Sequence, residues 1–249
     1  MSNKKVTAKD IAGMIDHSLL KPEMTVKDVV DGCFLAKEYG CATVCVRPCD
    51  VPIATETLKN SEVLVSTVVG FPHGSNLTNV KVMEAELAID SGCKELDMVL
   101  NIGRLKSGDF EYVENDIKAV CETAHKKGVI VKVILENYYL TDEEKEKACR
   151  ISERAGADFV KTSTGYAGGG ATIHDLKLMR SVSSDKMRVK AAGGVRTLDA
   201  VLEVRAVGAQ RCGASATKEI VEEAMNREES GTLALPDATG DGLSTGDEY

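Results

Sequence analysis

Residues 130–164, with the sequence IVKVILENYYLTDEEKEKACRISERAGADFVKTST, contain one complete strand–helix–strand unit. The short apolar, β-branched runs Ile130–Glu136 and Phe159–Thr164 are typical of buried strands. Between them, Thr141-x-x-Glu144 has the spacing of a helix capping box, and Gly156 stands where a helix should end. Two strands joined by a helix in this way are predicted to run parallel in one sheet.

The same unit repeats along most of the chain. Two further capping-box spacings, Thr7-x-x-Asp10 and Thr25-x-x-Asp28, begin helical patterns, and the first predicts an extra helix before the first strand. Glycines stand where helices should stop, at Gly40, Gly92, Gly128, Gly156 and Gly208. The strand candidates are Ile15–His17, Ala42–Arg47, Val63–Gly70, Glu95–Asn101, Ile130–Glu136, Phe159–Thr164, Arg188–Ala192 and Arg211–Gly213.

Eight strands of this kind favour a closed (β/α)8 TIM barrel over an open doubly wound α/β sheet, which usually has about five or six strands. No GxGxxG fingerprint follows Asp16-His17, and Gly168-Gly169-Gly170 lacks the GK[ST] ending of a P-loop, so we interpret it as a flexible loop. We expect one barrel domain over residues 1–227. Residues 228–249, rich in Gly, Thr, Ser and acidic residues, are expected to form a flexible acidic C-terminal tail.

The composition limits the class of protein and its partners. With 43% hydrophobic and 28% charged residues, the chain resembles globular proteins and not disordered ones. The formal net charge is −8, and residues 228–249 carry six acidic and no basic residues, so the predicted barrel is nearly neutral. Without a basic stripe, an apolar secretory segment or a membrane anchor, we expect a cytoplasmic protein that binds neither nucleic acid nor membranes.

The cysteines and histidines do not show the spacing of a metal site. Cys41, Cys45 and Cys49 are four residues apart, and along a strand this spacing separates successive cysteines by about 13 Å, too far to share one zinc ion. The four histidines show no HxH or HxxxH spacing, which disfavours a zinc-dependent enzyme. The eight cysteines include no CxxC pair and are expected to be reduced thiols. We therefore expect no metal.

Strand periodicity places four charged side chains inside the predicted barrel. In the strand at 95–101 the alternate positions are apolar and should pack on the helices, which leaves Asp97 pointing inward. The same alternation leaves Lys132, Lys161 and Lys190 inward on the next three strands. Charged side chains are rarely buried unless paired, so these four form either a structural ion network or a reactive site.

The second interpretation depends on the closeness of Lys161 and Lys190. Neighbouring strands lie about 4.8 Å apart, so the two ammonium groups could lie about 6 Å apart. Their repulsion would then be about 2.8 kcal/mol at an effective dielectric constant of 20, or roughly two pKa units. A lysine with a pKa near 7 is about half neutral and can condense with a carbonyl group. The resulting protonated imine accepts electrons when the neighbouring carbon–carbon bond breaks.

Five segments resemble the deoxyribose-phosphate aldolase family, and they occur in the family's order between about residues 10 and 225. KTSTG at 161–165 and KAAGGVRT at 190–197 are highly specific when found together. The other three are DHSLLKP at 16–22, VGFPHG at 69–74 and ELDMVLNIG at 95–103.

The resemblance implies a role for each of three charged residues. Lys161 would form the Schiff base, Lys190 would lower its pKa, and Asp97 would move protons together with Lys190 and a water molecule. The reaction implied is the reversible cleavage of 2-deoxy-D-ribose 5-phosphate to acetaldehyde and D-glyceraldehyde 3-phosphate. The partners would be a sugar phosphate and an aldehyde, with no cofactor, in a homodimer or larger homo-oligomer.

A phosphorylated substrate needs a phosphate site, which barrels often build from the loops after the seventh and eighth strands. Glycines there let backbone N–H groups approach the oxygens closely, although glycine also serves ordinary tight turns. Asp16, at the end of the first predicted strand, could hold a sugar hydroxyl or cap a loop, and the resemblance implies the first. The candidate phosphate-binding residues are Gly165, Gly193, Gly194, Gly213 and Ser215.

The sequence leaves open the roles of two tyrosines and two alternative functions. Tyr166 follows KTSTG where some family members carry lysine, so the strength of the phosphate requirement is open. Tyr249 ends the tail, and its phenol could transfer a proton at the barrel mouth. The alternatives are another Schiff-base aldolase acting on a different aldehyde or sugar phosphate, and a non-catalytic barrel that binds a phosphorylated metabolite.

Overall fold

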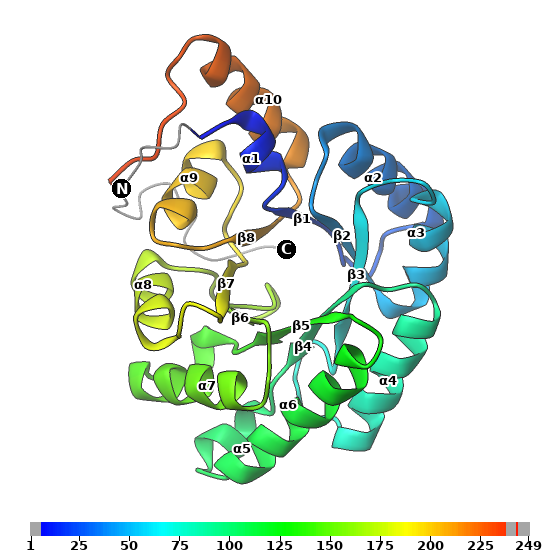
Figure 1. Ribbon diagram of the computed structural model, residues 1–249, viewed down its shortest axis with the longest axis vertical. Helices are drawn as coiled ribbons and strands as arrows, with labels where there is room; N and C mark the ends of the chain where they lie inside the picture. The colour runs from blue at the N-terminus through cyan, green and yellow to red at the C-terminus, as the bar shows by residue number, and fades with distance from the viewer. Residues whose placement is uncertain (1–5, 238–242, 244–249) are drawn as a thin grey trace.

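The computed structural model describes residues 6–237 and Leu243, and it confirms the predicted barrel. Eight parallel strands form a closed ring in which each strand pairs with its neighbour in sequence and β8 pairs with β1 (Figure 1). The strands are β1 (Ile15–Leu19), β2 (Thr43–Val46), β3 (Leu64–Val69), β4 (Glu95–Val99), β5 (Ile130–Ile134), β6 (Phe159–Lys161), β7 (Arg188–Ala191) and β8 (Arg211–Ala214).

Helices form the outer layer of the barrel (Figure 1). The predicted extra helix is present before β1 as α1, which packs against the last helix, α10. The helices are α1 (Ala8–Ala12), α2 (Val26–Tyr39), α3 (Val51–Thr57), α4 (Thr78–Asp90), α5 (Ile102–Lys106), α6 (Phe110–His125), α7 (Asp142–Arg154), α8 (Ile173–Val182), α9 (Leu198–Ala206) and α10 (Thr217–Glu229), with short 3-10 turns η1 (Pro48–Asp50) and η2 (Asn137–Tyr139).

The predicted helix boundaries follow from local hydrogen bonds. Thr7, Thr25 and Thr141 each accept a hydrogen bond from the backbone three residues later, which completes the three predicted capping boxes. Such caps satisfy N–H groups that have no partner inside the helix. At the other end of α2, Gly40 adopts a left-handed conformation with φ 70°, which a residue without a Cβ adopts at little cost.

The strand ends differ from the predictions by up to three residues. β6 ends at Lys161, whereas the apolar run predicted a strand to Thr164, because Thr164 donates its N–H and its hydroxyl to the carboxylate of Glu136. β1 is longer than predicted, since Ser18 and Leu19 pair with β2. Asp16 is therefore the second residue of a five-residue strand, and the prediction that it ends the strand is wrong.

Alternation along the strands separates an apolar layer from a polar interior. Leu96, Met98, Val131 and Val133 are fully buried and belong to the hydrophobic cluster between strands and helices. Their neighbours in sequence point to the barrel axis and include charged residues that are also fully buried. The core that stabilises the fold therefore lies outside the ring of strands, and the interior carries polar groups.

The last helix continues past the predicted domain boundary. Glu228 and Glu229 belong to α10, and a carboxylate oxygen of Glu228 accepts a hydrogen bond from the Ala8 N–H at 2.8 Å. Leu233 and Leu243 are buried. The barrel therefore includes at least two residues that were assigned to the tail at 228–249. Tyr249 lies outside the described residues.

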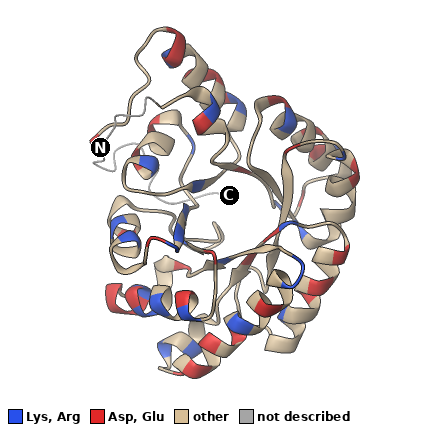
Figure 2. Cartoon of the chain, in the orientation of Figure 1, with Lys and Arg blue, Asp and Glu red and all other residues tan. Residues whose placement is uncertain are grey.

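Charges on the outer surface are mixed in sign. Figure 2 shows acidic and basic residues on the outer helices, with both signs on α7. Among the described residues, no helix is long and apolar enough to cross a membrane.

A buried ion pair joins α4 to α6 and was not predicted. The Lys81 ammonium lies 2.6 Å from an Asp116 carboxylate oxygen and 2.9 Å from the Val99 carbonyl oxygen, and both charged side chains are inaccessible to solvent. Thr78 donates to the other Asp116 oxygen at 2.8 Å. Because each charge has lost its water, each depends on the other.

We expect Asp116→Asn to lower the free energy of unfolding by about 3 kcal/mol, because an uncompensated charge remains buried. Denaturant titration measures the change. The control is Asp31→Asn, which removes the exposed partner of Lys27 and should cost less than about 1 kcal/mol. Equal effects of the two substitutions would contradict this account.

Candidate active site

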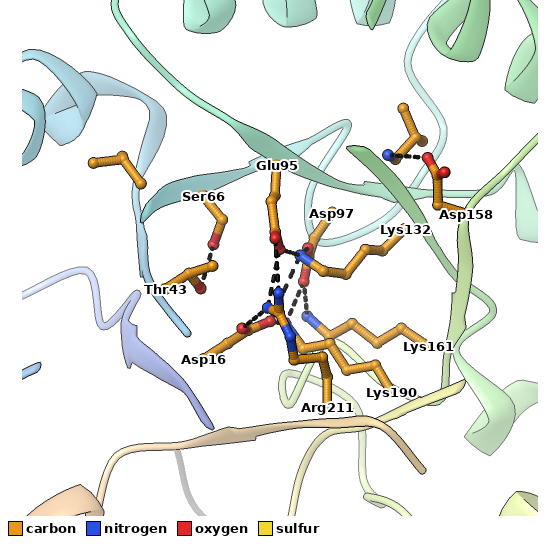
Figure 3. A network of polar contacts seen from close by, with 12 residues as sticks. Asp16, Thr43, Ser66, Glu95, Asp97, Lys132, Asp158, Lys161, Lys190 and Arg211 are labelled. Atoms are coloured by element: carbon orange, nitrogen blue, oxygen red, sulfur yellow. Dashed lines mark hydrogen bonds and ion pairs between the residues drawn. The ribbon is translucent and has the colours of Figure 1, made fainter. Parts of the chain in front are cut away.

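A single carboxylate, that of Asp97 on β4, contacts three lysines at the barrel axis (Figure 3). Its Oδ1 lies 2.7 Å from Lys132 Nζ, and its Oδ2 lies 2.8 Å from Lys161 Nζ and 2.7 Å from Lys190 Nζ. The two ammonium groups of Lys161 and Lys190 share one oxygen, so they lie no farther apart than the sum of those two distances. The structure thus brings together the four inward charged residues that alternation predicted.

The register of the sheet explains this convergence. Asp97 pairs with Lys132 across β4 and β5, and Lys161 pairs with Lys190 across β6 and β7. Paired residues on parallel strands point to the same side, so each pair presents both side chains to the interior. The long lysine side chains then span the interior to Asp97.

The carboxylate of Asp16 on β1 is the second partner of Lys190. Asp16 Oδ2 lies 2.5 Å from Lys190 Nζ, and its Oδ1 lies 2.5 Å from a guanidinium nitrogen of Arg211. Asp16 is therefore fully buried with both oxygens bonded to cations. Its predicted contact with a sugar hydroxyl stays a prediction.

Arg211 and Glu95 complete the network on the amino-terminal side. Arg211 contacts Glu95 at 2.8 and 3.1 Å, and Glu95 also lies 2.6 Å from Lys132. The Arg211 guanidinium lies 5.9 Å from the centre of the Phe159 ring, and the Arg188 guanidinium lies over the same ring at 3.9 Å. Phe159 and these guanidinium groups occupy the starts of β6, β7 and β8.

Arg211 was not predicted as a site residue, and Glu95 was predicted to point inward without a role. Glu95 was on the inward face of its strand, but Arg211 began a predicted strand of only three residues. The signal that could have identified it is the two-residue period, since Arg211 and the candidate Gly213 share one strand face.

The electrostatic surroundings separate the three lysines. Burial lowers the pKa of Lys161, and the neighbouring Lys190 charge lowers it further, against the opposing attraction of Asp97. Burial also disfavours the charge of Lys190, but Asp16 and Asp97 outweigh it and raise the pKa of Lys190. The pKa of Lys132 is raised for the same reason by Asp97 and Asp16. Lys161 is therefore the lysine of the three that most readily loses its proton.

The carboxylates stay ionised in this setting. Burial alone would raise the pKa of Asp97, but Lys132, Lys161 and Lys190 together hold it well below its usual range. Burial alone would also raise the pKa of Asp16, but the nearby cations, Lys190 most strongly, outweigh burial and lower it. Both residues therefore carry a negative charge at neutral pH.

The predicted phosphate loops lie at the carboxyl ends of the last strands. Gly193 and Gly194 follow β7 with φ values of 79° and 82°, which favour glycine. A Cβ on Gly170 would lie 2.5 Å from the backbone of Gly193, and the Ala171 N–H donates to the Gly193 carbonyl, so the loops after β6 and β7 touch. Gly165 follows β6 with φ 90°.

The other two predicted phosphate residues belong to the end of β8. Gly213 lies against the Lys190 side chain, since a Cβ there would be 3.8 Å from Lys190 Cε. Ser215 is exposed, between β8 and α10, outside the ion network.

Three buried side-chain polar atoms have no hydrogen-bond partner within the described part of the chain: Ser18 Oγ, Asn137 Oδ1 and Ser163 Oγ. The Asn137 amide lies against Met179 on α8, whereas Ser163 is two residues after Lys161 and Ser18 two after Asp16. Buried polar groups without a partner are uncommon in native proteins, so Ser18 and Ser163 are candidates for substrate contacts. None of the three was predicted as a site residue.

Tyr166 is anchored at the same end of the barrel. Its hydroxyl donates to the Leu20 carbonyl at 2.8 Å, and its ring meets Phe71 edge-on with 5.4 Å between the ring centres. The position after KTSTG thus holds a neutral, oriented phenol.

The group of side chains most similar to a metal site lies elsewhere, on α7 and α8. Ligand atoms of Asp142, His174 and Asp175 lie within 4.8 Å of one another. The Lys145 ammonium lies 3.1 Å from Asp142 and 2.7 Å from Asp175 and so pairs with both carboxylates.

Comparisons with known proteins agree with this geometry. The sequence model of DeoC/LacD family aldolases matches residues 2–236. A deoxyribose-phosphate aldolase of Caldanaerobacter subterraneus is 51% identical over 224 residues, which cover 90% of this chain and 97% of that protein. Similar crystal structures include a putative deoxyribose-phosphate aldolase from Coccidioides immitis, with 43% identity, a TM-score of 0.85 and coverage of 88% and 87% of the two chains. A tetrameric deoxyribose phosphate aldolase from Aeropyrum pernix has 31% identity, a TM-score of 0.82 and coverage of 87% and 92%. The chain belongs to the DeoC/LacD family of aldolases.

Proposed function

We propose that this chain is a deoxyribose-phosphate aldolase, which reversibly cleaves 2-deoxy-D-ribose 5-phosphate to D-glyceraldehyde 3-phosphate and acetaldehyde. The observation that carries the proposal is the position of Lys161, a buried lysine of lowered pKa that shares the Asp97 oxygen with a protonated Lys190. The names of the relatives support this choice of substrate.

Lys161 is the proposed nucleophile because its environment differs from that of the other two lysines. Lys132 and Lys190 each contact at least two carboxylates, whereas the ion pairs of Lys161 in the described chain involve Asp97 alone. Lys161 is also 3% exposed, against 1% and 0% for Lys190 and Lys132. A neutral amine that a carbonyl carbon can approach is what imine formation requires.

The proposed reaction runs through a covalent imine. The Lys161 amine attacks C1 of the open-chain sugar, and loss of water gives a protonated imine. When the proton of the C3 hydroxyl is removed, the C2–C3 bond breaks, its electron pair moves toward the imine nitrogen, and glyceraldehyde 3-phosphate leaves. The remaining enamine takes a proton at its terminal carbon, and water then releases acetaldehyde and restores Lys161.

Asp97 and Lys190 are the proposed proton-transfer groups. Asp97 Oδ2 contacts both Lys161 Nζ and Lys190 Nζ, so both groups lie close to the proposed nucleophile. Through a water molecule, the Asp97 carboxylate can accept a proton from the substrate and the Lys190 ammonium can donate one to it. The two groups can therefore serve both directions of the reaction. Asp16 supports this arrangement by holding Lys190.

The proposed phosphate site combines the loops after β6, β7 and β8. Gly193 and Gly194 are left-handed and follow β7, and Ser163, whose hydroxyl has no partner among the described residues, lies beside Gly193, with its Cβ 3.7 Å from a Cβ built there. Backbone N–H groups and hydroxyls are common phosphate ligands. Gly165, Gly213 and Ser215 stay candidates for the same site.

We also propose a homo-oligomer in a reducing compartment, the cytoplasm. A related aldolase is tetrameric according to its crystal structure. The α4 surface supports an association, since Leu77, Val80, Met83 and Leu87 are 45–67% exposed at helical spacing. All eight cysteines are free, as expected of a protein in a reducing compartment.

The second candidate is a Schiff-base aldolase that acts on a different aldehyde or sugar phosphate, and Tyr166 favours it. Its neutral phenol, hydrogen-bonded to the Leu20 carbonyl, stands where the lysine of some family members would place a positive charge.

Substrate comparison separates the two candidates. If the phosphate site works as proposed, kcat/KM for 2-deoxyribose 5-phosphate should exceed that for 2-deoxyribose by about a hundredfold or more, or ~2.7 kcal/mol of binding. Equal values would favour the second candidate.

Acetaldehyde with borohydride should add one reduced two-carbon group to Lys161, because the reduced imine is stable. Intact-mass spectrometry with peptide mapping detects it, and Lys161→Met should lack it. The matched control is Lys81→Met, which removes a buried lysine that contacts Asp116 on the outer helices. An adduct that persists in Lys161→Met would exclude the Schiff-base assignment.

Asp97→Asn should reduce kcat by about 10²- to 10⁴-fold, the usual contribution of acid–base catalysis. Lys161 remains in this variant, so the adduct should still form. Stopped-flow measurement of cleavage, combined with the trapping assay, separates the two steps. A variant with unchanged kcat would remove Asp97 from the proposed mechanism.

A further inference from the structure

The ion network at the barrel axis is unbalanced in charge. It contains four basic side chains, Lys132, Lys161, Lys190 and Arg211, and three carboxylates, Asp16, Glu95 and Asp97. All three carboxylates and Lys132 are inaccessible to solvent, and the Lys161 and Lys190 side chains are 4% and 1% exposed. An excess charge in such a site is costly, because burial removes the water that would stabilise it.

Arg211 is the source of the excess and lies away from Lys161. Its described ion-pair partners are Asp16 and Glu95, and its side chain is 14% exposed at the start of β8. Glu95 in turn lies 2.6 Å from Lys132. Arginine keeps its proton at any ordinary pH, so the network can become neutral by losing a proton from one of the lysines.

We propose that Arg211 and Glu95 are positioning residues that act as an opposed charge pair and determine how readily Lys161 gives up its proton for imine formation. This inference rests on the proposed Schiff-base function of Lys161. Neither residue contacts Lys161, so each acts through the carboxylates and lysines between them (Figure 3).

The differences among the lysines support this role. Lys190 and Lys132 each contact two or more carboxylates, so they keep their protons. Lys161 is therefore the lysine whose proton loss removes the excess positive charge. Removing the Arg211 charge would balance three cations with three anions and let Lys161 stay protonated. Removing the Glu95 charge would increase the excess and favour loss of the Lys161 proton.

Two other titratable groups lie near Lys161. Glu136 makes no ion pair within the described network, and burial raises its pKa, against hydrogen bonds from Thr164 and the charge of Lys161. Cys45 is a buried thiol with a raised pKa and stays neutral. The groups that act on Lys161 or on its partners in the network include Asp16 on β1, Cys45 on β2, Glu95 and Asp97 on β4, Lys132 and Glu136 on and after β5, Lys190 on β7, and Arg211 and Cys212 on β8.

The test measures imine formation against pH in two variants of opposite charge change. Acetaldehyde and cyanoborohydride are added between pH 5 and 9, and the rate of adduct formation on Lys161 is followed by mass spectrometry. For Arg211→Gln, the acidic limb should move to higher pH by about one unit, the effect of one charge about 10 Å away at an effective dielectric constant of 20. For Glu95→Gln it should move to lower pH by a similar amount.

Two controls separate this role from a structural one. Arg211→Lys keeps the charge, and its acidic limb should stay near that of the wild type even if the rate falls. The double variant Glu95→Gln/Arg211→Gln should return toward the wild-type limb. Circular dichroism and thermal unfolding show which variants are folded, and if one neutral variant does not fold, the direction of the shift in the other provides the test.

The results distinguish the inference from the proposed function. Shifts of opposite sign in the two single variants support the inference. Shifts of the same sign, no shift, or an Arg211→Lys limb that moves with Arg211→Gln would overturn it while leaving the adduct on Lys161 intact. Absence of an adduct from the wild-type protein would instead overturn the proposed function.

Discussion

Closure of the strand ring is the constraint on which the other features depend. Pairing of β8 with β1 leaves no sheet edge and forces the inward side chains of all eight strands into one narrow interior. In most barrels apolar residues fill this space. Here charged residues occupy it, so the geometry of the backbone alone brings lysines and carboxylates into contact that are up to 174 residues apart in sequence.

The reactivity of the site depends on how the lysine ammonium groups share the carboxylate oxygens. Asp97 binds three ammonium groups and cannot fully neutralise any of them, whereas Lys190 has two carboxylates. The unequal distribution makes Lys161 different from the other two lysines. The hydrophobic layer outside the ring keeps water away from this interior, which strengthens every interaction inside it.

The sequence predicted the barrel well because alternation and helix caps are local. The same alternation placed Asp97, Lys132 and Lys161 inside, but it could not show which oxygens each lysine would share. The estimate of repulsion between Lys161 and Lys190 omitted Asp97 between them. Arg211 shares a strand face with Gly213, but alternation in a predicted run of three residues did not show its partners. The Lys81–Asp116 pair joins two helices through tertiary packing that no local pattern encodes.

Phe159 packs under Arg188 at the amino-terminal end of the barrel, away from the loops that follow β6 and β7. In the proposed reaction the phosphorylated fragment departs first, while the two-carbon fragment is still attached to Lys161. During that interval the attached enamine is a carbon nucleophile. An aldehyde that enters before the enamine is hydrolysed meets this nucleophile, so the same site can also join two aldehydes into a longer chain.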